Sequence, residues 1–181
     1  MNVEGMNDYI QYSPSNLNNF PTSEIMLGNV SLTVKIADTQ SNMEQGLQFS
    51  KPLPYDEGML FMPQTPQVLP MWMPNMKFSL DIIWFDTNGN IQHIEKNVPP
   101  CTSLNQSTCP VYNENGSPSQ YALEVTSGFV DKFGISMNSK LALPIPEFGT
   151  LAGVITAIPL LGVLVISRKL RGSDLCLSAY T

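Results

Sequence analysis

The sequence predicts a mainly β domain, a compact antiparallel β-sandwich or barrel with two short helices, followed by one C-terminal transmembrane helix. Short segments alternate apolar and polar residues with the period of two that is typical of half-buried strands. Fifteen prolines and 12 glycines divide the 181-residue chain into short elements, and 43% hydrophobic residues suffice for a core. One long uncharged run near the C-terminus predicts the membrane helix.

The predicted β domain covers residues 25–145, after a flexible Asn-, Ser- and Pro-rich segment over residues 1–24. Residues 78–85 give the clearest strand signal, and the Asn-Gly pair that follows predicts a hairpin turn. Ser41 and Glu44 have the spacing of a helix capping box. The expected strands are residues 30–37, 58–61, 78–85, 91–96, 121–125 and 140–143, and the expected helices are 39–47 and 127–133, the second closed by Gly134.

The charge balance excludes some classes of function. The chain has 9 Lys and Arg against 15 Asp and Glu, a net charge of −6, whereas a nucleic-acid-binding domain carries a basic face. The sequence has one His and no visible nucleophile–base pair, phosphate loop or cluster at metal-ligand spacing. We therefore expect no nucleic-acid partner, no cofactor and no resident metal, and hydrolysis is disfavoured.

The C-terminal region predicts a single membrane pass. Residues 150–166 form an uncharged run of 17 residues, about 25 Å long as a helix. A basic cluster of Arg168, Lys169 and Arg171 follows, and such clusters stay on the cytoplasmic side, which places the β domain outside. A buried core helix is the alternative. Residues 1–20 show no export signal, so the signal lies outside this sequence or the protein is a cytoplasmic tail-anchored one.

A short motif directly precedes the apolar run. Its residues are Pro146, Glu147, Phe148 and Gly149. The order of motif, apolar helix and basic cluster over residues 146–171 resembles archaeal C-terminal sorting signals of the PEFG type. That resemblance implies a surface protein anchored in membrane lipid and processed by an archaeosortase-like enzyme. Such signals usually end soon after the basic cluster, whereas here a short tail over residues 172–181 follows.

Cys101 and Cys109 are separated by seven residues in a Pro- and Asn-rich loop. A location outside the cell permits a disulfide between them. The alternative is a pair of free thiols in a reducing cytosol.

Six segments occur in a recognisable order along the chain: Gly46-Leu47-Gln48-Phe49, Gly58-Met59-Leu60-Phe61, Trp72-Met73-Pro74-Asn75, Leu80-Asp81-Ile82-Ile83, Asn97-Val98-Pro99-Pro100-Cys101 and Tyr121-Ala122-Leu123-Glu124.

These ordered segments resemble domain-of-unknown-function family 192 over about residues 28–143. The resemblance implies a mainly-β sandwich or barrel of jelly-roll character and establishes no activity. The family usually has Arg where this chain has Ser50, and Lys where it has Pro74. Those departures argue against an anion site that depends on this Arg.

Four residues are candidates for a ligand site. Trp72 and Asn75 could form a pocket mouth, or they could belong to a loop that plugs the end of the sheet. Asp81 lies in the middle of an apolar strand and needs a partner if it is buried. It could bind a ligand or metal together with Glu124, or accept backbone hydrogen bonds from the loop around residues 71–76.

Several functions remain open on this evidence. The first is a surface-exposed, membrane-anchored β domain that binds a small ligand near Trp72, Asn75 and Asp81, or that is structural. The second is a carboxylate-based envelope enzyme that uses Asp81 and Glu124, which requires a defined separation of the two groups. The third is a copper-handling domain, which requires at least three methionine sulfurs at one point. The methionines concerned are Met59, Met62, Met71, Met73 and Met76.

Overall fold

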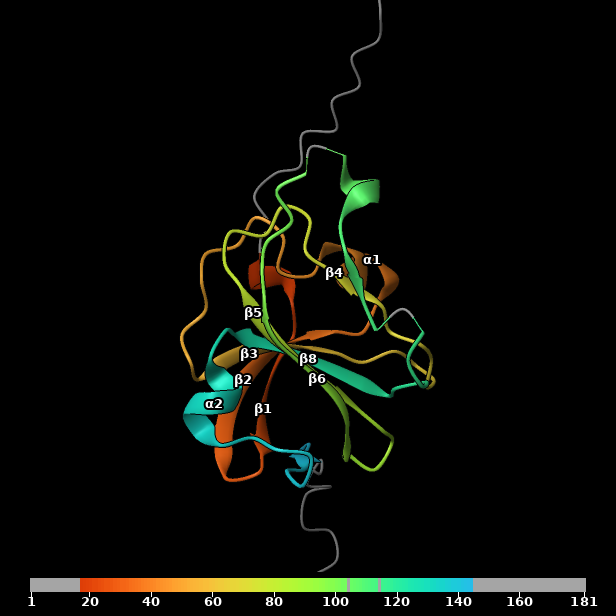
Figure 1. Ribbon diagram of the computed structural model, residues 1–181. Helices are drawn as coiled ribbons and strands as arrows, with labels where there is room; N and C mark the ends of the chain where they lie inside the picture. The colour runs from red at the N-terminus through yellow and green to blue at the C-terminus, as the bar shows by residue number, and fades with distance from the viewer. Residues whose placement is uncertain (1–16, 104, 114, 145–181) are drawn as a thin grey trace, which may run out of the picture. The chain divides into compact units, whose positions relative to one another are not determined.

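The computed structural model describes residues 17–103, 105–113 and 115–144, and a curled seven-stranded sheet dominates them (Figure 1). The strand order is β6-β5-β8-β3-β2-β1-β9. Its strands are β1 (Thr22–Leu27), β2 (Val30–Ala37), β3 (Glu57–Phe61), β5 (Leu80–Phe85), β6 (Ile91–Val98), β8 (Tyr121–Thr126) and β9 (Leu141–Ala142). The remaining elements are the ribbon of β4 (Met71–Trp72) and β7 (Val111–Tyr112), the helices α1 (Gln40–Gln45) and α2 (Phe129–Phe133), and the short 3-10 turns η1 (Leu17–Asn19) and η2 (Gln106–Thr108).

The predicted mainly β fold with two short helices is confirmed, but two details of it are wrong. The sheet is mixed rather than antiparallel, because β2 and β3 pair in parallel. The chain between these strands returns to its starting side through α1, and such a crossover places consecutive strands in parallel. Of the two predicted shapes, a sandwich or a barrel, the sandwich is wrong, because the seven strands form one curled half-barrel.

The two edges of the sheet meet at one end. A β-bridge joins Asn90, next to β6, to Lys140, next to β9. Gly89 makes this approach possible, since its φ is +77° and an added Cβ would lie 2.2 Å from the carbonyl oxygen of Leu141. Any side chain at position 89 would therefore push the two edges apart.

Two apolar clusters occupy the two faces of the sheet. Strand β5, next to the edge strand β6, has both faces buried, and its side chains alternate as its sequence predicts. Asp81, Ile83 and Phe85 face a cluster that draws residues from all seven strands and is closed by α2. The opposite face of β5 packs on a second cluster, which loops and the β4–β7 ribbon cover.

The two helices begin in different ways. The side chain of Thr39 caps α1 by accepting a hydrogen bond from the backbone N–H of Asn42. The predicted capping box at Ser41 and Glu44 is therefore wrong, because Ser41 already lies inside the helix. The expected closure of α2 by Gly134 in a left-handed conformation is confirmed.

The N-terminal boundary of the sheet differs from the predicted one, and the predictions for the C-terminal region fall outside the described residues. Strand β1 begins at Thr22, so the sheet extends into the segment predicted to be flexible. Within the described residues, no helix is long and apolar enough to cross a membrane. The predicted membrane helix, the motif at residues 146–149 and the tail at 172–181 lie outside the described residues, as do residues 1–16.

Candidate functional site

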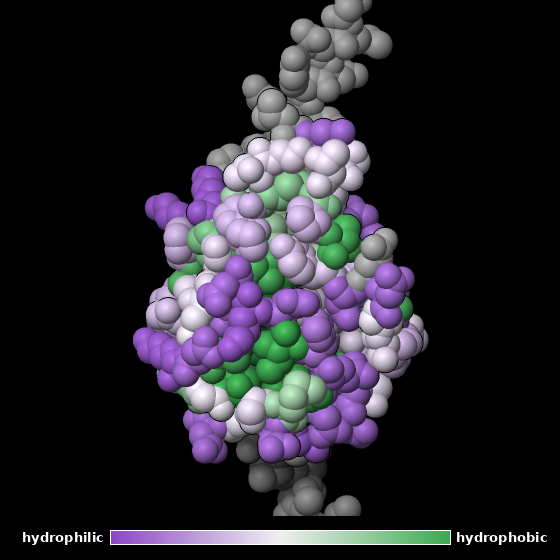
Figure 2. Space-filling model, in the orientation of Figure 1, coloured by the Kyte–Doolittle hydropathy of each residue, from purple (hydrophilic) through white to green (hydrophobic). Residues whose placement is uncertain are grey.

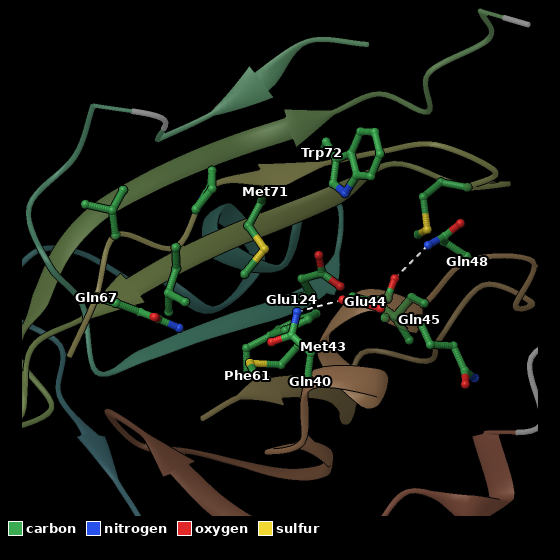
Figure 3. A pocket seen from close by; sticks show the side chains of 16 residues that line it. Gln40, Met43, Glu44, Gln45, Gln48, Phe61, Gln67, Met71, Trp72 and Glu124 are labelled. Carbon is green, nitrogen blue, oxygen red and sulfur yellow. Dashed lines mark hydrogen bonds between the residues drawn. The ribbon is translucent and has the colours of Figure 1, made fainter. Parts of the chain in front are cut away.

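A pocket of about 390 Å³ opens on the face of the sheet that carries the second cluster (Figure 3). Helix α1 and the turn after it form one wall, and the segment from Gln67 to Trp72 forms another. The apolar lining residues are Met43, Leu47, Phe61, Val68, Leu69, Pro70, Met71, Trp72 and Met76. Gly46 and the polar side chains of Gln40, Glu44, Gln45, Gln48, Gln67 and Glu124 complete the lining.

Glu124 is the chemically distinctive group of this pocket. It lies on β8, pairs with Met59 of β3 and Ile82 of β5, and is only 5% exposed. Figure 3 shows its carboxyl group inside the pocket between Met71 and Met43. Among the described residues, no side chain or backbone group hydrogen-bonds to this carboxyl. Burial raises the pKa of Glu124 to about 8, so this carboxyl group is mostly a neutral acid at pH 7.

Trp72 stands at the rim of the pocket. It lies on β4 and remains 45% exposed, which is high for an indole. The pocket wall beside it is held by the sheet, because the indole N–H of the buried Trp84 on β5 donates to the carbonyl oxygen of Leu69 at 2.8 Å. The rim therefore combines an exposed aromatic ring with a rigid backbone.

Asn75 supports the pocket without lining it. Its backbone is left-handed, with φ +57°, and its side-chain amide donates to Oε1 of Gln48 at 2.9 Å. The amide of Gln48 in turn donates to the backbone carbonyl of Glu44. Asn75 thus positions Gln48 against α1 and is not among the residues that line the pocket.

Asp81 has a structural role. It is fully buried, and its two oxygens accept 2.9 Å hydrogen bonds from the backbone N–H groups of Asn97 and Val130. Val130 lies in the first turn of α2, whose own N-cap, Gly128, offers no side chain. Asp81 therefore caps α2 from a distant strand. The structural alternative is the one observed, although the donors are not in the loop around residues 71–76.

The structure does not bring Asp81 and Glu124 together. In the register of β5 and β8, Asp81 is opposite Val125, whereas Glu124 is opposite Ile82. Side chains of adjacent residues in a strand point to opposite faces, so the two carboxyl groups lie on opposite faces of the sheet. This arrangement contradicts a paired-carboxylate mechanism for these two residues.

The methionines are distributed over both faces. Of the five predicted as a cluster, Met71 and Met76 line the pocket, together with Met43 from α1. Met59 and Met73 are buried in the cluster beneath it, and Met62 packs against the other cluster. The predicted set of five therefore does not converge on one point.

The predicted disulfide between Cys101 and Cys109 is present, with a Cα–Cα distance of 5.6 Å. It closes a loop that adjoins the ribbon at the pocket rim. The backbone N–H of Cys101 donates to the carbonyl oxygen of Met73, and Trp72 pairs with Val111 after the loop. The disulfide is thus linked to the strand that carries Trp72.

The other polar groups of the described residues form no comparable site. The described residues contain no group of three or more His, Cys, Asp or Glu side chains that could hold a metal ion. His93 is partly exposed on β6 and contacts Glu95 at 2.9 Å. Figure 2 shows a mainly hydrophilic face with a few hydrophobic patches. Val68, Trp72 and Val111 are among the large apolar side chains that reach the surface.

The sequence singled out Trp72, Glu124, Met71 and Met76 but not the rest of the pocket. The α1 residues Gln40 and Met43 and the opposite wall at Gln67 carried no signal, because ordinary polar and apolar side chains reveal a pocket only once two segments face each other. The alternation within residues 121–125 could have separated Glu124 from Asp81 only if the register with β5 were known.

Comparison with known proteins gives one family and two similar structures. No curated protein matches the chain. One solved structure, a candidate transcription regulator from Sinorhizobium meliloti 1021, has 27% identity and a TM-score of 0.61 over 68% of this chain and 95% of that one. Another, a protein of unknown function from Novosphingobium aromaticivorans DSM 12444, has 22% identity and a TM-score of 0.61 over 72% and 91% of the respective chains.

The family comparison covers the whole sheet apart from its first residues. The model of DUF192, described as "Uncharacterized ACR, COG1430", matches residues 24–143, from within β1 to just past β9. This range is about two-thirds of the sequence and agrees with the resemblance found in its ordered segments. The chain therefore belongs to the DUF192 family.

Proposed function

We propose that this β domain is a small-ligand-binding module whose site is the pocket between α1 and β4. The observation that carries the proposal is the carboxyl group of Glu124, which is 95% buried, faces the cavity and lacks a hydrogen-bond partner among the described residues. No side-chain oxygen or nitrogen among the described residues is fully buried without a partner, so the oxygens of Glu124 open onto the cavity, where a ligand can supply their missing contact. The volume and the mixed lining are typical of small-molecule sites.

Binding is favoured over catalysis because the pocket offers a single unpartnered acid. Asp81, the second acid that a carboxylate-based enzyme would need, lies on the other face of the sheet. Nucleic-acid binding is not carried over from the Sinorhizobium protein, because a net charge of −6 opposes the approach of a polyanion.

A second candidate is a Cu(I) site in the same pocket. Met43, Met71 and Met76 all line it, and thioether sulfur is a soft ligand that suits Cu(I). Titration with Cu(I) under a competing chelator would test this candidate. Loss of binding in M71L, with Met26→Leu on exposed β1 as the control, would support it.

We further propose that the domain is displayed outside the membrane. The Cys101–Cys109 disulfide supports this location, since disulfides persist in oxidising compartments. Residues 150–166 would hold the precursor in membrane lipid until an archaeosortase-like enzyme recognises the motif at 146–149, cuts the chain near it and transfers the protein to a surface anchor. The intact mass of the protein from its native membranes tests all of this. An end near Gly149 with two hydrogens lost is expected, whereas free thiols and an intact Thr181 would contradict surface sorting.

The binding function is tested by amide and indole NMR shifts during titration with five probes of different chemistry. These are hexylammonium, hexan-1-ol, hexanoate, methyl α-glucoside and N-acetylglucosamine. We expect at least one probe to shift the indole signal of Trp72 and the amides of Gly46 and Met71, while the buried indole of Trp84 moves less. If all five leave these signals in place, the pocket is not a binding site for small organic ligands.

A further inference from the structure

We infer that the ligand of this pocket is an organic ammonium ion whose charged nitrogen lies against the carboxyl group of Glu124. This inference rests on the proposed binding function and names the chemical class of its ligand. It is argued from the charge, the burial and the apolar walls of the pocket.

The charges of the lining favour a cation. Glu44 and Glu124 line the pocket, and no Lys, Arg or His is present among the described residues that line it. The carboxylate of Glu44 already accepts a hydrogen bond from the Gln40 side chain at 2.6 Å (Figure 3). An anionic ligand would meet the carboxylate of Glu44 and no compensating positive charge, whereas a cation would find the carboxyl group of Glu124 without a partner.

The burial of Glu124 defines what the ligand must bring. Met59 and Ile82 flank it on the neighbouring strands, and neither side chain can donate a hydrogen bond. An ammonium group supplies both N–H donors and a positive charge, and charge-assisted hydrogen bonds are stronger than neutral ones. Because the pKa of Glu124 is raised to about 8, this carboxyl group is mostly protonated at pH 7 before the ligand arrives. Binding of the cation would ionise the acid and release its proton to solvent.

The remaining walls suit the carbon part of such a ligand. Met43, Met71 and Phe61 surround the carboxyl group with apolar surface, and thioether side chains adapt to different shapes. Trp72 offers its exposed ring at the rim, where an indole face attracts cations or covers an alkyl chain. A divalent metal would lack ligands, since the described residues contain no cluster of three acidic, His or Cys side chains.

The test compares three probes that share one alkyl chain and differ only in the head group. Hexylammonium, hexan-1-ol and hexanoate are titrated calorimetrically against the wild-type domain, E124Q and the control variant E24Q. Glu24 is an exposed glutamate of β1, so E24Q makes the same chemical change away from the pocket. We expect wild type and E24Q to bind hexylammonium at least about tenfold more tightly than hexan-1-ol, and E124Q to lose this preference.

The pH dependence gives a second readout that needs only the wild-type protein. Below the pKa of about 8, the carboxyl group must lose its proton before it pairs with the cation. The affinity for hexylammonium should therefore rise by up to about tenfold per pH unit between pH 6 and 7 and level off above pH 8. Titration in buffers of different ionisation enthalpy should show nearly one proton released at pH 7.

The outcomes distinguish a failure of the ammonium inference from a failure of the proposed binding function. Equal binding of hexan-1-ol or a glycoside, without proton release, would overturn the ammonium inference and leave the binding function intact. Preferential binding of hexanoate would also overturn it. If none of the probes reaches the pocket, the inference and the binding function fail together. If E124Q does not fold, the number of protons released when hexylammonium binds the wild-type protein still tests the ammonium inference.

Discussion

Two buried carboxyl groups lie on the neighbouring strands β5 and β8 of this sheet and have different roles. Asp81 on β5 accepts two backbone hydrogen bonds, one of which caps α2. Glu124 on β8 faces a pocket and has no such partner among the described residues. On one face of the sheet the fold therefore supplies the hydrogen-bond donors of its buried acid, and on the other face it does not.

The difference shows that burial alone does not distinguish a structural acid from a binding acid. Both side chains are at least 95% buried, and both are surrounded by apolar residues. What differs is whether the fold itself supplies the donors. The predictions below test this contrast between the two faces, beginning with the largest expected effect.

Glu124 should make the protein less stable as the pH rises. Its pKa is about 8 in the folded state against 4.5 in an exposed chain, so between these values the folded state holds a proton that the unfolded state has lost. The free energy of unfolding then falls with rising pH, by at most about 5 kcal/mol at pH 8 relative to pH 4.5. In E124Q this fall should be absent. Urea unfolding of both proteins from pH 5 to 8.5 measures the difference, and parallel curves would contradict it.

Asp81 should behave in the opposite way, because its partners are already in place. In D81N one side-chain oxygen remains, so only one of the backbone N–H groups of Asn97 and Val130 keeps an acceptor. We expect a loss of about 3 kcal/mol in the free energy of unfolding. Binding of hexylammonium at pH 7 should be unchanged in the folded fraction. A weakened ligand affinity without a loss of stability would mean that Asp81 belongs to the binding face.

The disulfide is expected to stabilise the binding face in particular. Replacing Cys101 and Cys109 by Ser opens a loop with a sequence separation of eight, worth about 2 to 3 kcal/mol in the chain-entropy model. Because the loop adjoins the β4–β7 ribbon, hydrogen exchange should accelerate at Trp72 and Val111. The amide of Val130 on the other face is the internal control. Equal acceleration at Val130 would show that the two faces do not respond independently.

The sequence predicted the pattern within each strand better than the relations between strands. Alternation placed Ile83 and Trp84 on opposite faces of β5, as observed, and Asn-Gly marked the hairpin. The register of β5 against β8 is a tertiary property, and it alone separates Asp81 from Glu124. For the same reason the parallel pairing of β2 with β3 could not be read from either segment.

The N-terminal strand and the pocket were missed for different physical reasons. Strand β1 contributes only Ile25 and Leu27 to the core, and it follows a polar segment whose composition is typical of a linker. The pocket arises where α1 faces the segment at Gln67, so no single stretch of sequence contains it. The disulfide was predictable because its two cysteines lie close together in one loop.

The smallest expected effect concerns the cap of α1, which the chain supplies locally, whereas α2 depends on Asp81. T39A removes the hydroxyl that accepts from the backbone N–H of Asn42 at 3.2 Å, and should lower the free energy of unfolding by about 1 kcal/mol. T39S keeps the hydroxyl and serves as the control. Because Gln40 and Met43 follow this cap and line the pocket, the amide exchange of Asn42 should accelerate and hexylammonium affinity should fall slightly. A T39A loss as large as that of D81N would contradict the idea that the two faces differ in how completely the fold satisfies them.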